Sequence, residues 1–497
     1  MSTLTPRAAS SSPVRPNPEL PLPLPLIIQG GMGIAVSHWK LARSVSQAGQ
    51  LGVVSGTALA SVLVRRLQDG DADGAMRRAL AQCPLRAAAD RILTSYWIEG
   101  GRPPGQPHRL TPLPALDSTR ELAELTIVAN FTEVFLAKEG HGGVVGINLL
   151  EKIQLPTLPS LFGAMLAGVD FVLMGAGIPR AIPGVLDGLA AGQPVSLRLA
   201  VEGAGPAQEH TLTLDPAAFL PPPANLARPR FLAIVSSSTL ALTLARKSSG
   251  RVDGFVVEGI AAGGHNAPPR GTAQWNARGE PVYGPRDNAD LAAIRALGLP
   301  FWLAGSYAHP GKLRDALALG ATGVQIGTAF ALCDESGLTA ALKRSALGHS
   351  VAGTVDLLTD SRASPTGMPF KVVRLEDTVA DPAIYGQRAR TCDLGYLRQP
   401  YQREDGTVGY RCPAEPEADF IRKGGDPAET VGRKCLCNGL LAAIGLGQTR
   451  AEGATEPAIV TAGEDIVDAR RFLAPGRESY SAADVLRFMG VEAGQVT

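Results

Sequence analysis

The sequence predicts an α/β fold, a closed (β/α)8 TIM barrel, on two observations. Eight short apolar runs each end in glycine or other small residues, and an amphipathic helical stretch follows each run. Continuous apolar strands that alternate with helices are typical of a parallel sheet covered on both faces, and eight units favour closure. A doubly wound open sheet is the structural alternative. The expected strands lie at 26–32, 51–57, 143–149, 171–177, 231–237, 254–259, 301–306 and 323–328.

Helical periodicity supports this reading of the segments between the strands. Apolar residues recur at intervals of three or four, and Gly320 is placed to end the helix after the seventh strand. The longest apolar stretch, at 161–178, contains Asp170 and several glycines, so it predicts a helix followed by a buried strand and not a membrane span. The periodic residues are Leu41, Val45 and Ala48 after the first strand, and Leu313, Ala316 and Leu317 after the seventh.

Several segments exceed a minimal barrel. Residues 1–23, rich in Ser and Pro, are expected to form a flexible lead-in without a signal-peptide core. The barrel with its insertions should span 24–370, with a helical insertion at 58–142. At 189–230, two runs that alternate with period two around GAGPAQ predict an inserted β-hairpin. Residues 371–497 form a C-terminal extension that contains cysteines.

Charge and composition limit the partners. The chain of 497 residues has 47 Lys and Arg against 46 Asp and Glu, so no general field attracts nucleic acid or a membrane surface. A small-molecule substrate is therefore expected, and homodimer formation is left open. The absence of a targeting segment or membrane helix makes the cytoplasm the expected compartment.

Two turns predict a phosphate site. The seventh and eighth strands end in AGS, at 304–306, and GTAF, at 327–330. In a (β/α)8 barrel the active site lies at the C-terminal ends of the strands, and a phosphate commonly lies at the last two loops. Small residues allow backbone N–H groups to approach phosphate oxygens, although glycine also serves purely steric turns.

Four motifs in order, IIQGGM, VVEGIAAGGH, LAGS and GVQIGT, resemble those of the nitronate monooxygenase (2-nitropropane dioxygenase-like) family of flavoenzymes. They are equally similar to those of FMN-dependent enoyl-acyl carrier protein reductases. The resemblance covers roughly residues 24–370 and implies a TIM barrel that binds FMN noncovalently. Ser306 replaces a usual second glycine, and the insert NAPPRG lengthens the histidine motif. The implied flavin contacts are Gly31, Met32, Asn148, Ser237, Gly263 and Gly264, with Gly305, Ser306, Gly327 and Thr328 at the phosphate.

His265 is the candidate catalytic residue. A lone histidine is more often structural, but this one follows two glycines just beyond the sixth strand, and imidazole titrates near neutral pH. The resemblance implies that His265 removes the α-proton of a nitroalkane, or positions the nitronate, before oxidation by O2. In the alternative, NAD(P)H reduces FMN and an enoyl thioester is then reduced near His265. A lesser alternative is a flavin-carrying subunit of a lipid or polyketide assembly line that docks to a carrier protein.

Four cysteines of the extension, Cys392, Cys412, Cys435 and Cys437, lie within 46 residues. Because no pair has C-x-x-C spacing, reduced buried thiols are favoured over a zinc or iron–sulfur site and over disulfides. No metal ligand is therefore assigned. The remaining histidines lack helical metal-site partners and are expected to lie mostly in solvated loops or helix caps.

Overall fold

The eight predicted strands form one parallel barrel in this computed structural model, which describes residues 24–205, 208–221, 226–450 and 453–491. They pair in the order β1-β10-β9-β8-β7-β4-β3-β2. Backbone hydrogen bonds from Gln29 to Leu51 (2.9 Å) and from Leu51 to Ile27 (3.1 Å) join the two ends of this order. The strands are β1 (Ile27–Gln29), β2 (Gly52–Ser55), β3 (Val145–Leu150), β4 (Phe171–Gly175), β7 (Arg230–Val235), β8 (Gly254–Glu258), β9 (Phe301–Ala304) and β10 (Gly323–Ile326).

Closure confirms the predicted TIM barrel, and the open doubly wound alternative is wrong. The apolar strand sequences follow from burial on both faces. On β8, Val256 points into the barrel interior, where Trp302 and Phe171 also lie, whereas Phe255 and Val257 belong to the core between strands and helices. The helices around the barrel include α1 (Trp39–Gln47), α6 (Thr157–Leu166), α7 (Ile182–Ala190), α8 (Ser238–Lys247), α9 (Leu291–Arg295), α10 (Pro310–Ala318), α11 (Thr328–Ala331) and α12 (Ala340–Ala352).

The two periodic helices form as expected, with one difference. Leu41 and Val45 of α1 and Leu313 of α10 are buried, but Leu317 is exposed. Gly320 has a positive φ of 89°, a conformation that favours glycine and ends the helix.

Among the described residues, no helix combines the length and apolar composition needed to cross a bilayer.

Both insertions have the predicted type. The first is helical, with α5 as its longest helix, and the second is an antiparallel hairpin. Pro206 and Ala207 of the GAGPAQ turn, and the 1–23 lead-in, lie outside the described residues. The elements are α2 (Leu59–Gln68), α3 (Ala75–Leu80), α4 (Arg86–Tyr96) and α5 (Arg120–Lys138) in the first insertion, and β5 (Val195–Leu199) with β6 (His210–Leu214) in the second.

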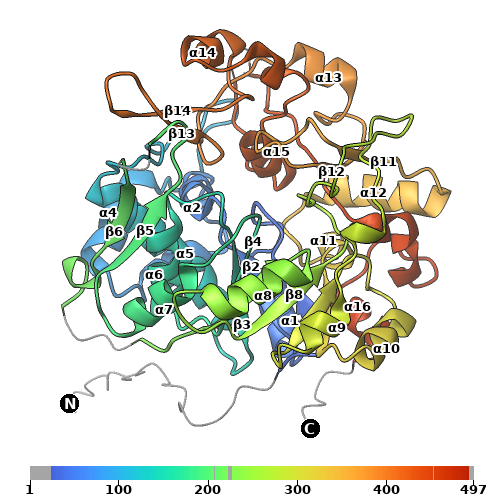
Figure 1. Ribbon diagram of the computed structural model, residues 1–497. Coiled ribbons are helices and arrows are strands. Elements are labelled where there is room, and N and C mark those ends of the chain that lie inside the picture. Colours follow the sequence, from blue (N-terminus) through green and yellow to red (C-terminus); the bar gives the residue numbers. More distant parts are fainter. Residues whose placement is uncertain (1–23, 206–207, 222–225, 451–452, 492–497) are drawn as a thin grey trace, which may run out of the picture.

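The C-terminal part of the chain packs around the strand ends and then returns along the barrel. Figure 1 shows α13, α14 and α15 on one side of the molecule and α16 near α1 and α10. Residues on both sides of position 370 share one apolar core. The boundary between the barrel at 24–370 and the extension at 371–497 therefore remains a prediction. The elements are β11 (Leu357–Asp360), β12 (Phe370–Val373), α13 (Pro382–Gln387), β13 (Gln399–Gln402), β14 (Val408–Arg411), α14 (Glu417–Arg422), α15 (Leu436–Ala443), the 3-10 segment η5 (Glu464–Phe472) and α16 (Ala482–Phe488).

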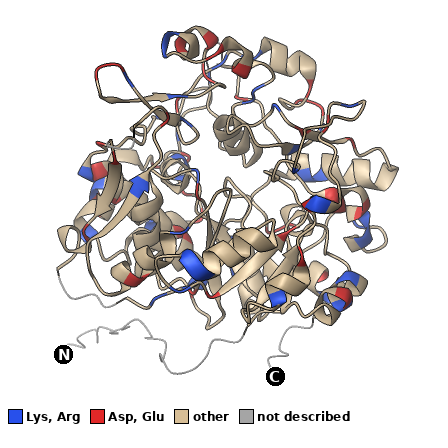
Figure 2. Cartoon of the chain, viewed as in Figure 1, with Lys and Arg blue, Asp and Glu red and all other residues tan. Residues whose placement is uncertain are grey.

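Figure 2 shows that ribbon segments coloured for Lys and Arg alternate with segments coloured for Asp and Glu along the described chain. This distribution agrees with the near balance of charges in the sequence.

Candidate active site

A cavity of about 310 Å³ lies at the C-terminal ends of the barrel strands. All eight strands, or the loops that follow them, contribute to its wall, and so do residues of the C-terminal part around α15 and η5. Active sites of (β/α)8 barrels form at this end because the variable loops converge there.

Ten of the eleven residues predicted for the site line this cavity. They are Gly31, Met32, Asn148, Gly263, Gly264, His265, Gly305, Ser306, Gly327 and Thr328. Ser237 does not line the cavity, whereas the preceding Ser236 does. Ser237 is the N-cap of α8, and its Oγ accepts a hydrogen bond from the Leu240 N–H at 3.2 Å. The run of three serines offers both a strand end and a helix cap, and the sequence does not separate them.

Glycine on the β1 loop permits a close approach to β3. A Cβ added at Gly31 would lie 2.3 Å from the Cβ of Asn148, which is far inside van der Waals contact. Asn148 itself is buried within β3. The absence of a side chain at Gly31 therefore lets the amide of Asn148 form part of the wall.

The turns after β9 and β10 form an anion cradle. Gly305 and Ser306 both have positive φ, 105° and 59°, and within the described residues their N–H groups donate to no protein acceptor. A Cβ at Gly327 would meet only the Met32 Sδ, at 3.7 Å, so this position faces open space. Because α11 has only four residues, loop N–H groups and the Thr328 hydroxyl, more than a helix dipole, are the available donors.

His265 is paired with a serine from a distant segment. Its Nε2 lies 2.7 Å from the Oγ of Ser364, a fully buried residue. The same Oγ accepts the Thr366 N–H at 3.2 Å and lies 2.9 Å from the Thr366 hydroxyl. The ring also packs edge-on against Phe370, with 4.8 Å between centroids.

Burial keeps His265 neutral. It lowers the pKa of His265 to about 4, with a smaller contribution from the positive charge of Lys152. Among the described residues, Nδ1 makes no hydrogen bond, so Nδ1 is the ring nitrogen available to a ligand. A neutral imidazole has one N–H donor and one acceptor, and Ser364 determines which nitrogen takes which role.

Two further polar groups in the cavity were missed in the sequence. Burial raises the pKa of Glu258, at the end of β8, to about 7. The Oε1 of Gln325, on β10, is buried and has no hydrogen-bond partner in the described part of the chain. Both residues lie within strands that were correctly predicted, so alternation along the strand was the signal that could have placed them at the cavity.

The C-terminal part also supplies cavity residues that the sequence did not indicate. Thr461, Gly463 and Asp465 come from TAGED, which carries only a weak turn signal. The Thr461 Oγ1 accepts the Gly264 N–H at 2.9 Å, and the Gly463 N–H donates to the Thr328 Oγ1 at 2.7 Å. These contacts join residues that are far apart in the sequence, so no local sequence pattern could have predicted them.

The apolar wall of the cavity lies toward α15. Met368 and Phe370 follow the β11 region, and Leu397, Leu436, Leu440 and Ile459 come from the segment around α15. This wall suits an apolar chain, because burying such a chain there removes apolar surface from water.

The four cysteines of the extension are free thiols that line one small void beside α15. Burial raises the pKa of Cys392 to about 12 and holds that of Cys437 well above its usual range. Across the described ranges, no group of three or more His, Cys, Asp or Glu is arranged to hold a metal ion.

The expectation of solvated histidines fails for His108, which is buried and lies 3.0 Å from the Asp69 Oδ1.

Comparison with known proteins matches part of the chain to one family. The family model described as nitronate monooxygenase matches residues 220–423. A nitronate monooxygenase from Pseudomonas aeruginosa is 39% identical over 124 residues, 24% of this chain and 32% of that protein. The (3aS,4S,5R,7aS)-5-hydroxy-7a-methyl-1-oxo-octahydro-1H-indene-4-carboxyl-CoA dehydrogenase from Mycobacterium tuberculosis is 32% identical over 159 residues, 32% of this chain and 39% of that protein.

The matched region spans about a third of the length of those two curated relatives. Among solved structures, nitroalkane oxidase from Streptomyces ansochromogenes aligns over 95% of this chain and 96% of its own, with 16% identity and a TM-score of 0.46. The fold assignment therefore depends on the strand pairing described above.

Proposed function

We propose that this chain, in which residues 220–423 match the nitronate monooxygenase family model, is an FMN-dependent oxidoreductase acting on an apolar carbon chain. One observation carries the proposal. One cavity joins loop amides that meet no acceptor in the described part of the chain, a neutral histidine and an apolar wall.

The residues present fit FMN. The N–H groups of Gly305 and Ser306 and the open space at Gly327 suit a phosphate, and the unpartnered buried Oε1 of Gln325 suits a donor on a heterocycle. Asn148 and the glycines of the β1 and β8 loops leave room for a flat ring. FMN, when bound, supplies two-electron transfer between a reductant and the substrate.

We propose a reduction for the chemistry of this site. The substrate is an α,β-unsaturated thioester, and each turnover consumes one NAD(P)H, one proton and one carbon–carbon double bond, giving NAD(P)⁺ and the saturated thioester. The Mycobacterium tuberculosis relative is named as a dehydrogenase of a carboxyl-CoA thioester, which supports a thioester ligand and leaves the direction of the reaction to the test below. The apolar wall toward α15 would hold the carbon chain.

His265 suits the role of hydrogen-bond donor better than that of strong base. With a pKa of about 4 it is neutral at pH 7 and has little tendency to take the α-proton of a nitroalkane. If the Ser364 hydroxyl donates to Nε2, the proton on Nδ1 can bind the thioester oxygen, on which negative charge develops. Glu258, with a pKa of about 7, can hold the proton that the reduced product needs.

Nitronate oxidation by O2 is the second candidate. The family match favours it. A preformed nitronate needs no base, so the low pKa of His265 does not oppose this reaction.

Anaerobic reduction of the flavin distinguishes thioester reduction from nitronate oxidation. The flavin-loaded protein is mixed without O2 with NADH, NADPH or an alkyl nitronate, and loss of visible flavin absorbance is followed. The proposal expects rapid bleaching by a nicotinamide and reoxidation by crotonyl thioester. Bleaching by nitronate alone, with no response to either nicotinamide, contradicts the thioester reduction and supports the second candidate.

A further inference from the structure

The segment 461–472, which includes η5, contacts the loops after three barrel strands. The Gly463 N–H binds the Thr328 Oγ1 after β10, at 2.7 Å. The Glu464 N–H binds the Ala261 carbonyl after β8, at 3.0 Å. A Cβ on Gly463 would lie 2.7 Å from the Ala261 oxygen, so the two backbones are in close contact.

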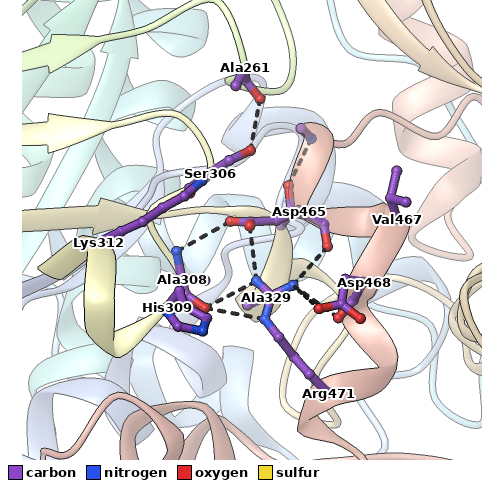
Figure 3. A network of polar contacts seen from close by, with 12 residues as sticks. Ala261, Ser306, Ala308, His309, Lys312, Ala329, Asp465, Val467, Asp468 and Arg471 are labelled. Carbon is purple, nitrogen blue, oxygen red and sulfur yellow. Dashed lines mark hydrogen bonds and ion pairs between the residues drawn. The ribbon is translucent and has the colours of Figure 1, made fainter.

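The third contact is made by an ion pair. Arg471 Nη2 lies 2.9 Å from Asp465 Oδ1, and the two side chains are only 12% and 13% exposed. Asp465 Oδ2 accepts the Ala308 N–H at 3.3 Å, while Arg471 Nη2 and Nε donate to the Ala308 carbonyl at 3.0 and 3.3 Å. Figure 3 shows this pair reaching Ala308, beside Ser306. Both polar groups of Ala308 are therefore fixed by the ion pair.

The residues fixed in this way adjoin the anion cradle. Ala308 is fully buried and lies two residues after Ser306, whose left-handed φ of 59° is costly for a residue other than glycine. The Lys312 Nζ also binds the Ser306 carbonyl, at 2.6 Å. The surrounding contacts must therefore maintain the turn that presents the Gly305 and Ser306 N–H groups.

Electrostatics gives a second reason why the anion cradle depends on the ion pair between Arg471 and Asp465. Asp465 lines the same cavity as Gly305, Ser306 and Gly327. A carboxylate in that wall would repel a phosphate dianion unless a positive charge compensated it. Arg471 supplies that charge while keeping its guanidinium on the Ala308 carbonyl.

We propose that Arg471, together with Asp465, is a positioning residue for the phosphate of FMN, so that phosphate recognition depends on the C-terminal segment. The inference rests on the proposed FMN binding. It assigns to Arg471 two effects: it fixes the turn at 305–308, and it neutralises Asp465 against the phosphate.

The test compares Arg471→Met with wild type, using flavin-free full-length protein. The control is Arg470→Met, on the neighbouring exposed residue whose ion pair with Asp468 is 57% and 58% exposed. Dissociation constants are measured for FMN and for riboflavin, which lacks the phosphate, by quenching of flavin fluorescence. We expect Arg471→Met to weaken FMN about 10- to 100-fold, as loss of a charge-assisted contact does, and to leave riboflavin within about twofold.

A second substitution isolates the charge effect. Adding Asp465→Asn to Arg471→Met removes the uncompensated carboxylate, so part of the FMN affinity should return. Arg471→Lys keeps the charge but loses the planar fork, and its FMN affinity should be intermediate. Arg471→Lys also provides the same FMN-to-riboflavin comparison if the methionine variant does not fold.

Three outcomes would overturn the inference. These are equal weakening of FMN and riboflavin, an unchanged FMN affinity in Arg471→Met and Arg471→Lys, or the same loss in Arg470→Met. If wild-type protein bound neither flavin, the proposed function itself would fail, and this result is distinct because it does not depend on the variants.

Discussion

The Nε2 of His265 lies 2.7 Å from the Oγ of Ser364, 99 residues later in the chain. This contact joins the loop after β8 to the turn before β12, and it orients the ring that the proposed chemistry uses. Since Ser364 is fully buried and also accepts the Thr366 N–H, the serine has a fixed position from which to select the tautomer of His265.

Ser364→Ala should lower kcat about tenfold, because the ring loses the partner that fixes its tautomer. The FMN dissociation constant should stay unchanged. The matched control is Ser237→Ala, which removes a helix cap at a cost of about 1 kcal/mol in stability but leaves turnover intact. Steady-state assays and thermal melts of both variants check this, and equal turnover for Ser364→Ala and wild type would contradict the orienting role.

His265→Asn should reduce turnover of an enoyl thioester by about 10²-fold while flavin binding survives. The pH profile is the sharper measurement. Because burial lowers the pKa of His265 to about 4, wild-type kcat/KM should show no inflection near 6.5 from this residue. An acidic limb centred near 6.5 that disappears in His265→Asn would show that the histidine titrates normally and would refute the neutral role.

The barrel and most of the predicted residues that line its cavity could be identified from sequence because their signals are local. An apolar run on β8 followed by a glycine pair determines where His265 stands, and the turns at Gly305 and Gly327 are visible as strand ends. Ser364 and Asp465 could not be predicted, since they reach the cavity only through tertiary packing of distant segments. The sequence does not separate Ser236, which lines the cavity, from Ser237, which caps α8, because the strand end and the helix cap fall on adjacent serines.

Glu258→Gln should stabilise the protein in a pH-dependent way. Burial raises the pKa of Glu258 from 4.5 to about 7, so between these values the folded state binds more protons than the unfolded state. Glu258 therefore contributes less to the free energy of unfolding of the wild-type protein as the pH rises from 4.5 to 7. Above pH 7 its contribution no longer changes. The Tm difference between Glu258→Gln and wild type should grow through that window and then level, and a flat difference would mean that Glu258 has an ordinary pKa.

Gly327→Val should abolish FMN binding and leave the flavin-free fold nearly as stable as wild type. A Cβ there meets only the Met32 Sδ, at 3.7 Å, so the added methyl groups occupy the cradle and not the core. Wild type should gain Tm on addition of FMN, since a ligand that binds only the folded state stabilises it, and the variant should not. Thermal melts with and without FMN are the measurement, and an equal FMN-induced rise in both proteins would place the phosphate elsewhere.

The apolar wall should determine chain length. Leu440 lies on α15, partly buried and facing the cavity, so Leu440→Trp should shorten the space available to a carbon chain. KM for a decenoyl thioester should rise about tenfold while KM for crotonyl thioester changes little, because only the longer chain must reach this wall. Leu317→Trp on the outer face of α10, at an exposed position, is the control and should leave both values unchanged. Equal effects on the short and long substrates would mean that the chain does not run toward α15.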